Sequence, residues 1–374
     1  MTGEEYRAAV RDVVYLAACA VNGRTPDSTR VARMELPLVY EAADHHLLTG
    51  ITAIALAGAG VQDDAFTQAR GKAIRKVAAF DVERAAILAQ LEQAGIWYMP
   101  LKGCILKELY PQLGMRQMAD NDILYDASRR ADVRSIMEGL GFNTEEIKHQ
   151  SVHDHYFKPP VCNFEMHRKL FGANQGKLAV YYRDVKTRLL RTEGTEYGFH
   201  FRSDDFYVYM TAHEYKHYSG GGTGLRSLLD TYVYIGKKGA ELDWDYIGGE
   251  LEKLGIAGFE AQNRSLARHL FAGEALTAAD EEMLNYILSS GTYGTVWNRV
   301  NNNLSAFGDR PQSRIRYVCS RVFLPLKSVK ILFPLFYKHP LLLPFLPFYR
   351  VYRCVTVNKG KLRAELKALA RYKK

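Results

Sequence analysis

Two aspartates, Asp120 and Asp122, stand at the head of a short apolar segment with one residue between them. Side chains two positions apart on a β-strand project from the same face of the sheet. The two carboxylates can therefore hold a pair of hard divalent cations between them, a geometry that serves phosphoryl transfer. An Asp-x-Asp pair alone is weak evidence, because such pairs are also common on protein surfaces, so the neighbouring segments decide its weight.

The segment before the aspartates has the order strand, glycine turn, helix. Residues 96–101 read as a short strand, Lys102 and Gly103 break it, and a helical run covers residues 104–110. A glycine lets the backbone come close to a ligand, and the free amides at a helix start attract phosphate. Lys102 and Arg116 flank this turn and could neutralise a triphosphate. The alternative is that both are solvated members of a set of 50 basic residues.

Beyond the aspartates the pattern predicts a helix and then a hairpin. Ser128 can cap a helix that runs to about Gly139. Two strands follow, at residues 153–158 and 162–170, with a turn at Pro159-Pro160 between them. The second strand alternates polar and apolar residues, which is typical of a strand with one packed face.

The register of this hairpin decides which side chains face Glu165. If paired residues have numbers that sum to about 320, His155 lies opposite Glu165 and His153 lies opposite His167. A slip of one residue would undo both pairs. As metal ligands His153 and His155 are weaker candidates than the acids, because magnesium prefers oxygen.

Taken together, these motifs resemble the bacterial nucleotidyltransferase family with a polymerase-β-like core. The similar residues are Leu101-Lys102-Gly103, Tyr110-Pro111 and the run Gly114-x-Arg116-x-Met118-x-Asp120-x-Asp122. The resemblance implies that the turn at Gly103 grips the nucleotide phosphates and that Asp120, Asp122 and a third carboxylate bind Mg²⁺ or Mn²⁺. Glu165 fits the third position, because the family has an acid, any residue and then His there, as in Glu165-x-His167. Cys104 departs from the family, in which a hydroxyl residue often follows the glycine, so here the backbone amide would have to serve.

An ordinary structural interpretation exists for each of these residues. Asp120 could cap a turn, Glu165 could pair with Arg168 or Lys169 at the surface, and the histidines could lie on a polar face. The order of the elements favours the functional interpretation, because a glycine turn, a helix, paired acids, a helix and a hairpin with one acid follow one another.

A second group of polar residues lies further along the chain. His213 and His217 are one helical turn apart, and a glycine-rich loop at residues 219–224 separates them from Arg226 and Asp230. The resembled family has a similar His, His, Arg-x-x-x-Asp pattern, which implies that these residues and His167 reach phosphate or the acceptor substrate. Alternatively, Arg226 and Asp230 pair with each other. A zinc protease is disfavoured, because a third ligand is missing nearby.

The composition indicates a globular protein. The chain has 374 residues, of which 47% are hydrophobic, and a net charge of +9 that suits nucleotide, nucleic acid or anionic lipid as a partner. Five scattered cysteines form neither a zinc pattern nor a disulfide framework. The N-terminus is acidic where a signal peptide would be basic, so we expect a cytoplasmic protein.

The flanking regions read as helical. Residues 4–21, 31–59 and 64–94 are predicted to be helices, and Asp44-His45-His46 is better explained as a helix-face or core feature than as a phosphohydrolase site. Near the C-terminus, residues 321–350 are rich in Phe and Leu but contain five prolines, which defeat a membrane-spanning helix. This segment should pack on the helical domain or lie along a membrane surface as a peripheral contact.

These observations predict an α+β fold with a small mixed sheet as the nucleotidyltransferase core. The predicted regions are N-terminal helices (1–95), the core (96–200), a helical domain (201–320) and a basic tail (321–374). The predicted activity is transfer of a nucleoside monophosphate from an NTP, with ATP expected, to a small molecule, sugar, peptide or protein. Two alternatives remain open. One is an RNA nucleotidyltransferase, disfavoured because no RNA-binding motif is present, and the other is a non-catalytic nucleotide-binding or membrane-surface protein.

Overall fold

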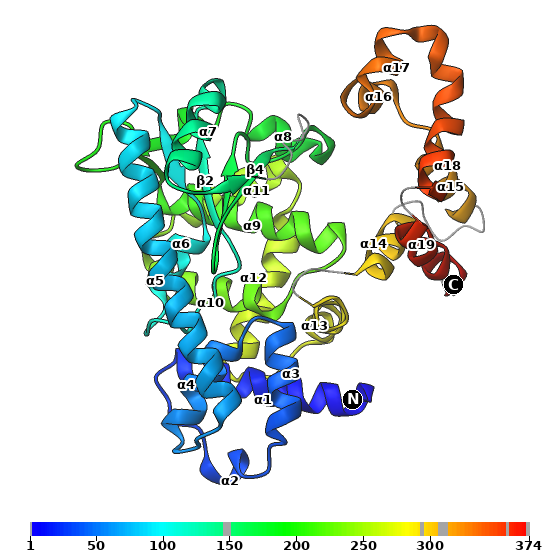
Figure 1. Cartoon of the computed structure of the whole chain (residues 1–374). Helices are drawn as coiled ribbons and strands as arrows, with labels where there is room; N and C mark the ends of the chain where they lie inside the picture. The colour runs from blue at the N-terminus through cyan, green and yellow to red at the C-terminus, as the bar shows by residue number, and fades with distance from the viewer. Residues whose placement is uncertain (1, 145–150, 292–294, 306–312, 357–358, 372–374) are drawn as a thin grey trace. The chain divides into compact units, whose positions relative to one another are not determined.

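The computed structural model describes residues 2–144, 151–291, 295–305, 313–356 and 359–371 (Figure 1). The chain divides into two compact units. The first consists of Met1–Glu214 and Gly224–Leu288, and the second of Tyr215–Thr223 and Ser289–Lys374. The first unit holds every predicted site residue except His217. The division into four regions stays a prediction.

Two of the three predicted N-terminal helices are confirmed. Helix α1 spans Gly3–Val21 and begins with a capping box, in which Thr2 and Glu5 satisfy each other's backbone amides. Helix α5 spans Asp64–Gln93 and begins where the Asp63 carboxylate accepts from the amide of Phe66. Along its length α5 buries Val77, Phe80 and Ile87 against the sheet core.

The prediction of one helix over residues 31–59 is wrong. The chain there forms α2 (Ser28–Val31), α3 (Leu36–His45) and α4 (Thr49–Gly58). Pro37 fits the first turn of a new helix but cannot continue an old one. Leu47 has a φ of 55°, which ends α3 before α4 begins. His46 between them is fully buried and bonded to Tyr6 and to the amide of Leu225, which agrees with its interpretation as a core histidine.

The core of the first unit is a mixed five-stranded sheet in the order β1-β2-β5-β4-β3. Its strands are β1 (Tyr98–Pro100), β2 (Asn121–Tyr125), β3 (Asn143–Thr144), β4 (His153–Lys158) and β5 (Cys162–His167). Strands β2 and β5 are parallel, and the other neighbours are antiparallel. The predicted hairpin is therefore confirmed, although its second strand ends at His167 rather than at Leu170.

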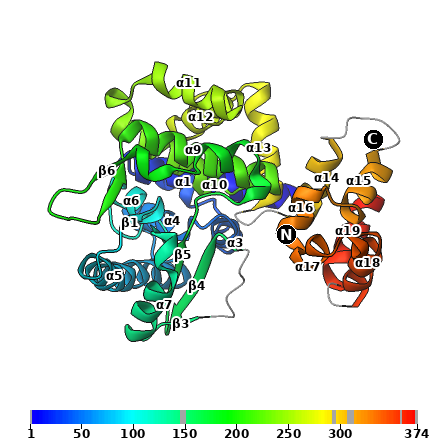
Figure 2. The ribbon, with the colours of Figure 1, turned by 90° about the horizontal axis from the view of Figure 1, so that it is seen from above.

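Helices cover both faces of this sheet. Figure 2 shows α5 and α7 (Arg130–Gly139) on one side, and α9 (Ser203–Gly220) and α10 (Leu225–Lys238) on the other. Under α5 and α7 the core contains Phe80, Met137 and Phe164, all fully buried. The predicted cap of α7 is wrong in detail. Asp126 accepts from the amide of Ser128 and starts a 3₁₀ turn, η2 (Ala127–Arg129), from which α7 continues.

The remaining elements of the first unit are short turns and further helices. They are α6 (Gly103–Leu106), η1 (Lys107–Leu109), η3 (Ala173–Gln175), α8 (Lys177–Tyr181), η4 (Val185–Arg188), β6 (Leu189–Arg191), β7 (Phe199–Phe201), η5 (Gly239–Glu241), α11 (Trp244–Leu254), α12 (Ala257–Ala272) and α13 (Ala278–Ser290). Helices α9 and α10 lie on either side of the glycine-rich loop, but α9 runs through to Gly220 and so takes in the first part of the predicted loop.

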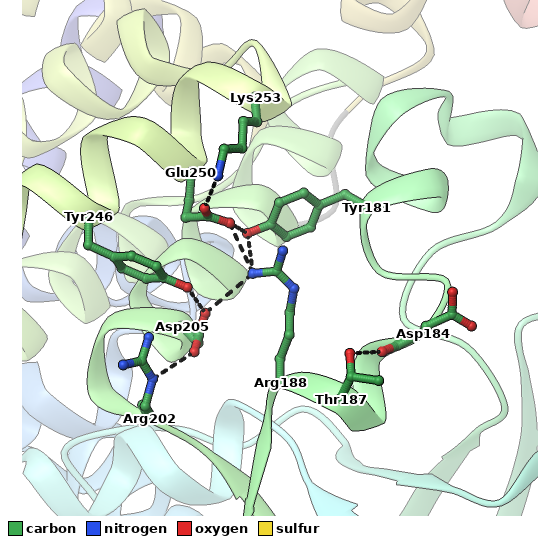
Figure 3. Close-up of polar contacts among 9 residues, drawn as sticks. All are labelled: Tyr181, Asp184, Thr187, Arg188, Arg202, Asp205, Tyr246, Glu250 and Lys253. Atoms are coloured by element: carbon green, nitrogen blue, oxygen red, sulfur yellow. Dashed lines mark hydrogen bonds and ion pairs between the residues drawn. The ribbon is translucent and has the colours of Figure 1, made fainter.

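A network of charged side chains fastens the segment after the sheet to two of these helices (Figure 3). Arg188 donates to Tyr181 and to Glu250 of α11, with a distance of 2.9 Å to the Glu250 carboxylate. It also lies 3.6 Å from Asp205 of α9, which accepts from the hydroxyl of Tyr246. Both carboxylates are nearly buried, so Arg188 supplies charge where water has little access.

The second unit contains α14 (Val296–Ser305), α15 (Ser313–Val322), α16 (Leu326–Leu332), α17 (Pro334–Lys338), η6 (Pro340–Phe345), α18 (Leu346–Thr356) and α19 (Lys359–Arg371). A small core of Val300, Leu304, Tyr317 and Ala368 joins α14, α15 and α19. With the helices of both units and the mixed sheet, the predicted α+β class is confirmed.

Candidate active site

The pairing of β2 with β5 brings three carboxylates together. Asp122 and Glu165 are register partners on these parallel strands, so both side chains project from the same face. Asp120 immediately precedes β2. One oxygen from each of Asp120, Asp122 and Glu165 lies within 4.8 Å of the others, close enough to share a metal ion. The structure thus brings the three predicted acids together, although Glu165 lies 43 residues after Asp122 in the sequence.

Strand β4 adds histidines to this cluster. His155 pairs with Glu165 and His153 with His167, as the predicted register required. The Nδ1 atom of His153 lies 3.1 Å from the Glu165 carboxylate, and Nε2 of His167 lies 3.0 Å from that of Asp122. Ligand atoms of His153, Glu165 and His167 also lie within 4.8 Å of one another. Glu165 therefore belongs to two overlapping groups of potential metal ligands.

The carboxylates differ in their charge balance. Burial and the neighbouring charge of Asp122 raise the pKa of Asp120. Burial also disfavours the charged form of Asp122, but the hydrogen bond and charge of His167 outweigh it and hold the pKa of Asp122 well below its usual range. His167 is buried, yet its bonds to Asp122 and Glu165 raise its pKa to about 9. The positive charge of His167 thus offsets only part of the repulsion among Asp120, Asp122 and Glu165.

This donor set fits a divalent cation. Three carboxylates converge in a partly buried place, and hard oxygen ligands are those that Mg²⁺ and Mn²⁺ prefer. Burial and then the charge of Asp122 disfavour the ionised form of Asp120, and added positive charge at this point would offset both effects.

Two cations of the chain act on the same acids. Burial lowers the pKa of Lys102, and the charges of Asp122 and Asp120 oppose that shift. Arg226 donates to the carbonyl of Gln117 over 3.0 Å, and its charge acts on Asp120. Both are therefore placed to meet a phosphate chain that approaches the acids.

Lys76 is a third such cation, which the sequence analysis did not single out. It lies on α5 and donates to the carbonyl of Ala119 over 2.7 Å, beside Asp120. Lys76 lies more than forty residues before the aspartates in the sequence. Its position within α5 does not distinguish it from the other basic residues of that helix, so the sequence alone could not have identified it.

The turn after β1 is tightly packed. A Cβ atom on Gly103 would lie 2.9 Å from Cε of Met118 and 3.5 Å from Nη1 of Arg116, so glycine fits this point best. The thiol of Cys104 is turned inward and donates to the carbonyl of Leu101 over 3.0 Å. Burial raises the pKa of Cys104 to about 11. The Cys104 thiol is thus occupied inside the protein.

Arg116 and Asp230 form a buried ion pair with each other. Nε and Nη2 of Arg116 lie 2.7 and 2.9 Å from the two oxygens of Asp230, which also accepts from the hydroxyl of Tyr110. The alternative pairing of Arg226 with Asp230 is therefore wrong. Arg116 joins the segment before β2 to α10, and its Nη1 lies 3.4 Å from the carbonyl of Gly103.

The two histidines of α9 are one helical turn apart, and the division of the chain into units falls between them. His213 is in the first unit, and its ring centroid lies 6.2 Å from that of Tyr209. His217 is exposed and belongs to the second unit. Tyr209 was missed by the sequence analysis. It is buried, and burial, with a smaller contribution from the charge of Asp122, raises the pKa of its hydroxyl well above its usual range.

The fold and these side chains define a class of protein in which a small mixed sheet presents clustered acids beside a glycine turn. Comparison with known families agrees, because residues 34–272 match the family described as Uncharacterised nucleotidyltransferase. The match covers more than half of the chain, and the chain belongs to this family. Neither the curated proteins nor the solved structures that were compared include a match. Family membership supports a general function in nucleotidyl transfer.

Proposed function

We propose that the protein transfers a nucleoside monophosphate from an NTP to an acceptor in a metal-dependent reaction that releases pyrophosphate. The single observation behind this proposal is the convergence of Asp120, Asp122 and Glu165. ATP is the expected donor, and the cytoplasm, where NTPs are held, is the expected compartment. The acceptor belongs to one of four classes, which are small molecules, sugars, peptides and proteins.

In this proposal each part of the site has a separate task. Asp120, Asp122 and Glu165 hold Mg²⁺ or Mn²⁺, which supplies charge stabilisation at the phosphates and at the acceptor oxygen. Lys102 and Arg226 bind the triphosphate and stabilise the charge that develops on it. The backbone amides of Gly103 and Cys104, at the start of α6, would meet the phosphates.

The bond changes of the reaction are simple. The acceptor oxygen forms a bond to the α-phosphorus, and the bond from that phosphorus to the bridging oxygen of pyrophosphate breaks. Pyrophosphate leaves with the electron pair of that bond. The acceptor hydroxyl also loses its proton, which passes to water or to a carboxylate of the acidic cluster.

Binding is the first test, because it requires no knowledge of the acceptor. ATP, GTP, CTP and UTP are titrated calorimetrically into the native chain with Mg²⁺, and then into an Asp120→Asn/Asp122→Asn double variant. An Asp132→Asn/Glu138→Gln variant is the control, since it removes two acids that pair with arginines on the exposed side of α7. We expect magnesium-dependent binding in the native and control chains and its loss in the double variant.

Turnover is the second test. Transfer of label from [α-³²P]NTP to candidate acceptors, with and without RNA, follows with the nucleotide that binds. Binding without release of pyrophosphate with any acceptor class would favour a non-catalytic nucleotide-binding protein, and dependence on RNA would favour an RNA nucleotidyltransferase. Absence of nucleotide binding by the native chain would overturn the proposal.

A further inference from the structure

The second unit exposes an unusual amount of apolar surface. Among the described residues, 22 large hydrophobic side chains are exposed, and 13 of them lie within residues 323–356. These thirteen are Phe323, Leu326, Leu332, Leu335, Tyr337, Leu341, Leu342, Phe345, Phe348, Tyr349, Val351, Tyr352 and Val355. Soluble proteins rarely expose a large cluster of this kind unless it contacts a partner or a membrane.

The segment has too little of its own core to bury these side chains. In residues 323–356 only Val329 and Leu346 are buried among the described large hydrophobic residues. Phe333, Phe336 and Tyr349 pack against one another, which holds α16, α17 and α18 together as a compact turn (Figure 1). Most of the other large apolar side chains of α16, α17, η6 and α18 are exposed to solvent.

Prolines keep each helix of the segment short. Pro334 starts α17, Pro340 starts η6, and Pro347 lies in the first turn of α18. The longest of these elements, α18, has 11 residues, whereas about 20 are needed to cross a bilayer. Across the described part of the chain, no helix is both long enough and apolar enough to span a membrane. The short helices of this segment can therefore contact an apolar environment from one side but cannot cross a bilayer.

The basic charge of the protein is concentrated at the same end of the sequence. Residues 310–374 contain 16 Lys and Arg and one acidic residue, Glu365. Residues 1–309 contain 34 basic and 40 acidic residues, a net charge of −6. Within the apolar segment Lys330, Lys338 and Arg353 are exposed. The net charge of +9 is therefore a property of the C-terminal part and not of the unit that carries the candidate active site.

We propose that residues 323–356 bind the surface of an anionic lipid bilayer, with Leu341, Phe345 and Phe348 inserted among the lipids and the basic side chains against the headgroups. Exposed apolar residues combined with cations and without carboxylates match the chemistry of such a surface. RNA would match the charge, but it offers no partner for exposed Leu and Val side chains. The proposal concerns the second unit alone and does not depend on the proposed nucleotidyl transfer.

The test measures binding of the full-length chain to vesicles by co-sedimentation. Vesicles of phosphatidylcholine alone are compared with vesicles that also contain phosphatidylglycerol, at low and at high salt. Leu341 and Phe348 are 89% and 74% exposed, so a Leu341→Glu/Phe348→Glu variant should fold normally. A Val82→Glu/Val180→Glu variant is the matched control, because both valines are also exposed but lie in the first unit.

We expect the native and control chains to bind the anionic vesicles and to be released by high salt. The Leu341→Glu/Phe348→Glu variant should bind roughly a hundredfold more weakly, because two large apolar side chains no longer enter the lipid. A Lys338→Gln/Arg353→Gln variant should lose about tenfold on anionic vesicles and little on neutral ones.

Three results would overturn the proposal. The first is no vesicle binding by the native chain at low salt. The second is equal loss of binding in the control and the Leu341→Glu/Phe348→Glu variants. The third is a stable dimer, seen by light scattering, that only the Leu341→Glu/Phe348→Glu variant disrupts, because a second copy of the chain would then cover this face.

Discussion

Glu165 is the residue at which the two possible metal-binding groups meet. One group adds Asp120 and Asp122, which offer only oxygen, and the other adds His153 and His167, which offer nitrogen. Imidazole is a poor ligand for Mg²⁺, binds the transition-metal ion Mn²⁺ somewhat better and suits Zn²⁺. In the proposed site, the choice of metal should therefore depend on His153 of β4 as well as on the acids.

A His153→Ala variant should change the metal preference of the site. We expect its affinity for Mn²⁺ to fall by roughly tenfold, with little change for Mg²⁺, as measured by calorimetric titration of each ion. His155→Ala is the control, because His155 is more exposed, lies 3.5 Å from Glu165 and belongs to neither group. Equal weakening of both ions in the His153→Ala variant would contradict an imidazole ligand.

Glu214 should make stability depend on pH. Burial is the main cause that raises its pKa to about 8, opposed by bonds from Asn263 and Thr231. The unfolded chain releases this proton near its usual pKa of 4.5, whereas the folded chain keeps it. Because the folded state then binds more protons, the free energy of unfolding falls as pH rises from about 4.5 to 8 and levels off above that.

A Glu214→Gln variant tests this sign. Its unfolding free energy should not show the decline, so relative to the native chain it gains about 1 kcal/mol or more between pH 5 and pH 9. Urea denaturation across that range measures the difference. Glu138→Gln, at an exposed position on α7, should track the native curve, and parallel curves for the Glu214→Gln and native chains would show that Glu214 is not the cause.

At the scale of elements, the Arg188 network should hold α9 and α11 to the segment that follows the sheet. An Arg188→Met variant keeps the length of the side chain but leaves Glu250 and Asp205 without their shared cation. Glu250 keeps Lys253 and Asp205 keeps Arg202, so the loss should be about 2 kcal/mol, which chemical denaturation should detect. Lys253→Met is the matched control, since Lys253 also pairs with Glu250 but is 65% exposed, and it should cost less than about 1 kcal/mol.

The elements show what the sequence could predict. The alternation of apolar and polar residues around Glu165 gave the hairpin and its register, because a slip would move a packed face into water. The parallel pairing of β2 with β5 could not be read from periodicity, and only the family resemblance pointed from Asp122 to Glu165. The break at Leu47 was also missed, although Asp44-His45-His46 before it and Thr49-Gly50 after it interrupt the apolar pattern there.

Some of the site residues could be predicted from the sequence, and others depend on tertiary packing. The three acids follow from type, spacing and resemblance, and the structure brings them together. The ion pair of Arg116 with Asp230 and the position of Lys76 depend on how α10 and α5 pack on the sheet, which is tertiary information. The inward turn of the Cys104 thiol depends in the same way on the carbonyl of Leu101.

At the scale of the whole molecule, the two units should respond differently to nucleotide. All three acids, Lys102 and Arg226 lie in the first unit, while the second has its own core of Val300, Leu304, Tyr317 and Ala368. A ligand at one hundred times its Kd stabilises the folded state by about 2.7 kcal/mol. That stabilisation belongs to the unit that binds.

Hydrogen–deuterium exchange read by mass spectrometry can assign this stabilisation to a unit. With Mg²⁺ and the preferred NTP, peptides that cover β2, β5 and the start of α10 should exchange more slowly, and peptides from α16 to α18 should be unchanged. Anionic vesicles should give the opposite pattern, with slower exchange in α16 to α18 alone. Protection of α16 to α18 by nucleotide without lipid would mean that the second unit takes part in nucleotide binding, because a ligand slows exchange only where it contacts or stabilises the chain.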